Sequence, residues 1–212
     1  MGRGAAKGGK PDSSALNFFF LLHLEVHLLP PPLARFTHQF PGVELSLTEA
    51  DPHTVVQRLR QGEVDIGVLP LPRVADDLDI WDITGDEFVV LLPKSAMIIP
   101  NPISWEELAH YPFILLDDAE CTQAVKEHWK SCGQPLTVAY QIKAESTIVS
   151  MVGQGLGAAI LPRLAALPIP DSVCIRSIPA PLERRIGVAI LSQVMQPPAV
   201  LTFLNLLRSL QL

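Results

Sequence analysis

Three places along the chain combine a hydroxyl, imidazole or thiol group with the expected start of a helix. They are His53-Thr54, Cys121-Thr122 and Ser146-Thr147. The first backbone N–H groups of a helix have no partner within the helix, so they can bind a carboxylate or another polar group. We therefore expect these places to contact a small-molecule effector, with ordinary helix capping as an equal alternative.

The spacing of the cysteines and glycines argues against a metal site and a nucleotide-binding loop. Cys121, Cys132 and Cys174 are an odd number of cysteines without the C-x-x-C spacing of zinc sites, which favours a reducing compartment over a disulfide framework. The glycine-rich stretch 153–157 follows a helical pattern and precedes a strand, the reverse of a phosphate-binding loop. We interpret it as a helix end and turn, and we expect no cofactor and no metal.

Other reactive side chains do not form a recognisable catalytic set. His23 and His27 have the spacing of a metal-binding pair on a helix, but we interpret them as ordinary surface or cleft histidines. Adjacent carboxylates do not converge on one face of a helix or strand, so they do not predict acid and base catalysis. These pairs are Asp76-Asp77, Glu106-Glu107 and Asp117-Asp118.

Apolar runs of strand length alternate with segments of helical period along the chain. This pattern predicts an α/β fold with a largely parallel sheet. The expected strands cover residues 18–22, 43–48, 64–69, 87–92, 113–116, 137–142, 158–161 and 185–191. The expected helices cover residues 29–40, 53–61, 104–110 and 122–131, with others starting at Ser146 or Thr147, at Pro162 and near Val200.

Two breaks in the alternation of expected strands and helices predict two lobes. Residues 70–82 are rich in proline and acid without a clear period, and the last strand and helix have no obvious place in the lobe that precedes them. We predict two Rossmann-like lobes separated by a hinged cleft. Lobe one comprises residues 16–82 and 183–212, lobe two comprises residues 83–182, and residues 1–15 form a disordered leader.

Composition limits the classes of partner. The chain has 212 residues, 48% of them hydrophobic, and a net charge of -6 with 16 scattered basic residues. An acidic surface without clustered lysine and arginine argues against direct contact with nucleic acid, so DNA binding would need another module. The apolar run at 16–22 follows basic residues as in a signal peptide, but it is too short to span a membrane. We expect a cytoplasmic protein.

Several segments together resemble the effector (substrate)-binding domain of LysR-type transcriptional regulators. The resemblance covers about residues 28–205 and depends on the segments 29–36, 40–45, 62–67, 105–108 and 145–162, the last reading ESTIVSMVGQGLGAAILP. It implies two lobes of the type 2 periplasmic-binding-protein fold, an effector in the cleft, a homo-oligomer and an N-terminal winged helix-turn-helix, which this sequence does not contain. By register, His23 lies where the family usually has a serine or threonine that contacts the effector.

A narrower resemblance is to the OxyR-like peroxide sensors. It depends on residues 115–121, which end on Cys121, and on residues 49–53. The resemblance implies that the Cys121 thiolate attacks peroxide and becomes a sulfenic acid, which Cys132 would trap. Cys132 lies one to two residues beyond the usual position of the resolving cysteine, which favours a sensor with a single reactive cysteine.

The neighbours of Cys121 act in opposite directions on its reactivity. A helix that begins at Thr122 would lower the pKa of the thiol, whereas Glu120 and Asp118 would raise it. An ordinary, partly buried thiol is the alternative for Cys121. We interpret Cys174 as a core residue.

The leading hypothesis is a non-catalytic sensor domain that responds to a small-molecule effector or to peroxide, with no membrane partner. The alternatives are a periplasmic solute-binding protein and, with least support, an enzyme. The sequence leaves open the identity of the effector and the origin of the missing DNA-binding half.

Overall fold

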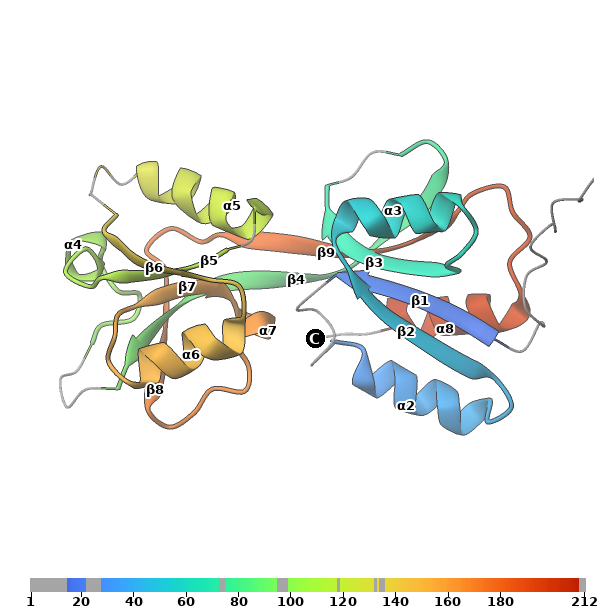
Figure 1. Ribbon diagram of the computed structural model, residues 1–212, viewed down its shortest axis with the longest axis horizontal. Helices are drawn as coiled ribbons and strands as arrows, with labels where there is room; N and C mark the ends of the chain where they lie inside the picture. The colour runs from blue at the N-terminus through green and yellow to red at the C-terminus, as the bar shows by residue number, and fades with distance from the viewer. Residues whose placement is uncertain are drawn as a thin grey trace, which may run out of the picture. The chain divides into compact units, whose positions relative to one another are not determined.

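The computed structural model describes residues 15–21, 28–72, 75–94, 99–117, 119–131, 133 and 136–209. The expected leader up to residue 14, His23 and Cys132 lie outside these residues. The chain forms two compact units (Figure 1). The first comprises residues up to Thr84 and from Ile186 onward, and the second comprises Gly85–Arg185.

The first unit is built on a sheet whose strands lie in the order β2-β1-β3-β9-β4. Both β2 and β3 pair with β1 in parallel, with Leu16 opposite Leu45 and Phe19 opposite Gly67. The strands are β1 (Ala15–Leu21), β2 (Glu44–Ala50), β3 (Ile66–Leu71), β4 (Leu78–Pro93) and β9 (Glu183–Leu191).

Three helices pack on this sheet. They are α2 (Pro30–Gln39), α3 (Pro52–Arg60) and α8 (Pro198–Arg208). Figure 1 shows α3 on one face of the sheet and α2 and α8 on the other. Phe36 and Phe203 are fully buried and meet edge to face with ring centroids 5.3 Å apart, which joins α2 to α8. After α3 the chain turns through Gly62, whose φ of 66° suits glycine.

The second unit contains a mixed sheet. Strand β5 (Phe113–Leu116) pairs in parallel with β6 (Val138–Ile142), while β7 (Ala159–Pro162) and β8 (Val173–Ser177) pair antiparallel with β4. The prediction of a largely parallel sheet is therefore wrong for this unit. A short buried strand has the same apolar pattern in either direction, so the residues alone do not specify how it pairs.

The helices of the second unit are α4 (Trp105–Leu108), α5 (Ala119–Lys130), α6 (Glu145–Gly153) and α7 (Arg163–Ala166). Trp129 on α5 is nearly fully buried and packs edge to face on Phe113, with centroids 4.8 Å apart. A Cβ atom added at Gly157 would lie 2.2 Å from the carbonyl oxygen of Pro112, so only glycine fits between α6 and β7. The predicted helix end and turn at 153–157 agrees with these elements.

The strand β4 and the helix α5 both begin earlier than the apolar pattern predicts. β4 starts at Leu78 rather than at residue 87, because its first half alternates only weakly between buried and exposed side chains. α5 starts three residues before Thr122, so Cys121 lies within the first helical turn. In the described part of the chain, no helix is both long enough and apolar enough to cross a bilayer.

Candidate functional site

Cys121 lies half-buried in the first turn of α5, directly after the buried strand β5. The hydroxyl of Thr122 donates a hydrogen bond to the carbonyl oxygen of Leu116, the last residue of that strand. This bond closes the short connection between strand and helix and fixes the first turn of α5. The hydroxyl of Thr122, expected to contact an effector, is therefore used to position Cys121.

A buried ion pair lies beside the thiol. Asp86 on β4 has a side chain that is 0% exposed, and Arg184 on β9 has one that is 10% exposed. The guanidinium donates Nε–H and Nη2–H hydrogen bonds of 3.0 and 2.8 Å to Oδ2 of Asp86. The second carboxylate oxygen accepts a 3.0 Å hydrogen bond from the backbone N–H of Leu164. Both oxygens of the buried carboxylate thus have partners, as a buried charge requires.

The third guanidinium nitrogen reaches the cysteine. Nη1 of Arg184 donates to Sγ of Cys121 over 3.7 Å, and Asp86 holds the guanidinium in place for this contact. A cation beside a sulfur atom favours the thiolate over the thiol, and the thiolate is the reactive form. The sequence prediction named Cys121 but missed Arg184 and Asp86. These two residues are 98 positions apart, and no local pattern joins them.

At the second predicted place, the start of α3, the polar groups cap the helix. Asp51 accepts a 3.0 Å hydrogen bond from the backbone N–H of Thr54 and a 2.6 Å bond from its hydroxyl. These hydrogen bonds, the one from the Thr54 side chain first, lower the pKa of Asp51. His53 is exposed and lines a cavity of about 390 Å³. Thr54 therefore takes part in the helix cap, whereas His53 lines the pocket.

The third place, at the start of α6, leaves its hydroxyls on the surface. The helix begins at Glu145, one residue before the first predicted start, and Ala144 at the cap position provides no side-chain hydrogen bond. Ser146 and Thr147 are exposed in the first turn. Glu145 is 6% exposed, and the sequence analysis did not single it out.

Metal binding finds no support in the part of the chain that the structure describes. No group of three or more His, Cys, Asp or Glu side chains is placed there to hold an ion. The pair His23 and His27 lies outside the described residues, as does Cys132, so the proposed roles of these residues stay predictions.

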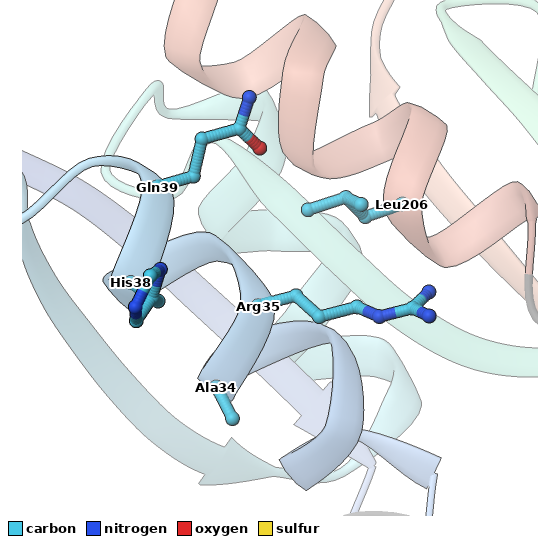
Figure 2. Close-up of a pocket in the computed structure, with 5 residues that line it drawn as sticks. All are labelled: Ala34, Arg35, His38, Gln39 and Leu206. Carbon is cyan, nitrogen blue, oxygen red and sulfur yellow. The ribbon is translucent and has the colours of Figure 1, made fainter.

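A shallow groove of about 580 Å³ runs between α2 and α8 in the first unit. In Figure 2, the side chains of Arg35 and Gln39 extend from α2 toward α8, where Leu206 lies. The groove is wide open, and none of the residues predicted to bind an effector lines it. Its shape suits contact with a surface better than the enclosure of a small molecule.

Strands covered by helices, in two units that share the long strands β4 and β9, define the two-lobed α/β class of the type 2 periplasmic-binding-protein fold. Residues 9–211 match the family described as "LysR substrate binding domain". The chain belongs to this family.

The probable regulator LrrA of Synechococcus elongatus, an HTH-type transcriptional regulator, is 57% identical over 182 residues, covering 86% of this chain and 62% of that protein. The chain therefore spans less than two thirds of that relative's length. LrrA and IlvY of Escherichia coli, which is 27% identical over 171 residues and of which 57% is covered, are both described as HTH-type transcriptional regulators. A periplasmic solute-binding protein is not favoured.

Solved structures share the fold. The regulatory domain of CcmR from Synechocystis PCC6803, in complex with 2-PG, has a TM-score of 0.79 at 20% identity and covers 92% of this chain and 96% of that domain. A mutant OxyR of Corynebacterium glutamicum has a TM-score of 0.76 at 18% identity and covers 92% of this chain and 63% of that protein. At these identities the likeness concerns the fold alone.

Proposed function

We propose that this chain is the sensing part of a LysR-family transcriptional regulator and that Cys121 is its oxidant-responsive group. The observation that carries the proposal is the 3.7 Å contact between Nη1 of Arg184 and the Cys121 sulfur. The buried Asp86 carboxylate holds the guanidinium in this position, and the Thr122 hydroxyl holds the first turn of the helix. All four side chains belong to the second unit. Arg184 comes from β9, Asp86 from β4, and Cys121 and Thr122 from α5.

The chemistry is a two-electron oxidation of sulfur. The Cys121 thiolate attacks one oxygen of hydrogen peroxide, a sulfur–oxygen bond forms and the oxygen–oxygen bond breaks. The hydroxide that leaves takes up a proton and becomes water. The oxygen bonded to sulfur keeps its own hydrogen, so the product is a neutral sulfenic acid. Arg184 favours this reaction by stabilising the anionic sulfur before the attack.

Oxidation changes what Arg184 contacts. The anionic sulfur disappears and an oxygen occupies space beside the guanidinium, so the contact between Arg184 and Cys121 must rearrange. Arg184 lies on β9 and Asp86 on β4, the two strands whose residues belong to both units. A change at this ion pair therefore acts on the segments that connect the two units.

Intact-mass measurement after exposure to a small excess of hydrogen peroxide tests the proposal. We expect a rapid gain of one oxygen atom, lost in Cys121→Ser and kept in Cys174→Ser. Cys174 is a matched control because it is also half-buried and packs in the same unit. Equal oxidation of the Cys121→Ser variant, or a rate no faster than that of free cysteine, would refute a sensing role for this thiol.

A second candidate is an anionic organic effector that binds without thiol chemistry. The exposed hydroxyls of Ser146 and Thr147 at the start of α6 support it, because the N–H groups there favour negative charge. The CcmR domain, described in complex with 2-PG, provides a probe. Thermal stabilisation by 2-PG that the Ser146→Ala, Thr147→Ala double variant loses would support this candidate, and no stabilisation of the parent chain would argue against it.

The proposal also covers the partners of the whole regulator, which are DNA and further copies of the same chain. The acidic chain would leave DNA contact to the part of the protein that corresponds to the rest of the LrrA length. The chain would act as a homo-oligomer, which sedimentation of the purified protein tests.

A further inference from the structure

The first unit contains a pocket that the proposed thiol site does not use. It has a volume of about 390 Å³, and residues of α3, β3 and β4 line it together with Pro72 and Ala75. Leu69 and Leu78 are among its lining residues, but they are 0% and 7% exposed and belong to the core of this unit. The accessible surface of the pocket therefore comes from its other lining residues.

The helix presents one continuous face to this pocket. His53, Val56 and Arg60 line it and are spaced three and four residues apart, so they fall on the same side of α3. Val55 and Leu59, on another side of the helix, are fully buried and supply its packing on the sheet. On the pocket face, Val56 also packs partly against the core, whereas His53 and Arg60 are exposed.

The opposite wall is also apolar. Ala75 and Ile80 line it and are only partly buried against the core. The lining combines these apolar side chains with polar groups, and a cavity of this size is within the range of small-molecule sites. Here the polar groups are His53 and Arg60.

The charge at the rim is balanced. Arg60 donates Nε–H and Nη2–H hydrogen bonds of 2.6 and 3.0 Å to the two carboxylate oxygens of Asp77. Hydrogen bonding to Arg60 lowers the pKa of Asp77, and the same contact raises the pKa of Arg60. Both groups stay charged at neutral pH and cancel each other. This pair fixes the guanidinium, and in the described structure its other N–H groups remain for an acceptor.

We propose that this pocket binds a small uncharged molecule with an aromatic or branched aliphatic body and a carbonyl oxygen. The apolar body lies against the partly exposed side chains of Val56 and Ile80, and the carbonyl accepts a hydrogen bond from Arg60 or His53. A neutral ligand fits better than an acid because Asp77 already neutralises Arg60 and repels a second carboxylate. The site lies in the unit that does not contain Cys121, so it operates whether or not the thiol senses oxidants.

Three probes test the chemical class. We expect 3-phenylpropanamide to raise the Tm of the 212-residue chain, while propanamide, which lacks the ring, does not. At a tenfold excess over a Kd of about 1 mM the expected shift is about 3 to 6 °C. The acid 3-phenylpropanoate should give a clearly smaller shift. Equal shifts for the amide and the acid would overturn the assignment of a neutral ligand.

Variants test the location. Val56→Trp fills the pocket and should abolish the shift, whereas Gln57→Trp, one residue away on α3 and outside the pocket lining, should keep it. Ligand-detected NMR with 3-phenylpropanamide repeats the comparison without heating. If Val56→Trp fails to fold, Ala75→Phe fills the pocket from the opposite wall. Binding that survives in a folded, filled variant, or no binding to the parent chain, would overturn the proposal.

Discussion

Removing the buried carboxylate of Asp86 should destabilise the second unit strongly. Its side chain is 0% exposed and holds the Arg184 side chain, which is 10% exposed. Asp86→Leu leaves that guanidinium without its counter-charge and costs about 3 to 5 kcal/mol of unfolding free energy. The backbone N–H of Leu164 also loses its acceptor, which accounts for about 1 to 3 kcal/mol of this cost.

The double variant separates these two contributions. Asp86→Leu with Arg184→Met removes both charges, so only the cost of the unpaired N–H group at Leu164 should remain, about 1 to 3 kcal/mol. Urea unfolding followed by circular dichroism measures the free energies of the parent, the single variant and the double variant. Asp77→Ala, which breaks an exposed ion pair, is the control and should leave the midpoint almost unchanged.

An Asp86→Leu variant that costs no more than the exposed-pair control would contradict this expectation. A double variant that is less stable than the single one would also contradict it. Either result would mean that the carboxylate does not balance a buried guanidinium, and the position of Arg184 beside Cys121 would need another cause.

Three further predictions follow from the local geometry. Arg184→Met should slow the oxidation of Cys121 by peroxide roughly tenfold, because a hydrogen bond to a charged group contributes about 1.5 kcal/mol. Stopped-flow kinetics measures the oxidation rate. An unchanged rate would show that the guanidinium takes no part in the reaction. Asp51→Ala should cost about 1 kcal/mol at pH 7 through loss of the α3 cap. Since the folded pKa of Asp51 lies below 3.8, its contribution is present above that value and lost as pH falls through the folded pKa, so the parent and Asp51→Ala should converge in acid. Gly157→Ala should lower the Tm sharply because its Cβ would lie 2.2 Å from a main-chain carbonyl oxygen, whereas Gly42→Ala, with open space around it, should not.

Much of the local structure follows from the residues alone. The α/β class, the strand at 113–116 and the helix starts near His53 and Ser146 are all encoded by nearby residues, because hydrophobic period, capping and glycine position act within one or two turns. The family resemblance also depends on motifs such as residues 145–162, and the match to residues 9–211 confirms it.

The tertiary structure decided which groups meet. In the sequence, Asp86 is only an acidic residue at the start of an apolar strand. Arg184 is only one of two arginines that precede another apolar strand. Only the placement of β4 and β9 brings them together and then to Cys121, across separations of 98 and 63 residues. The same holds for Arg60 and Asp77, which are 17 residues apart and which no local pattern joins. Local pattern determines where elements form, whereas pairing between distant elements depends on packing of the whole chain, which no short window of residues contains.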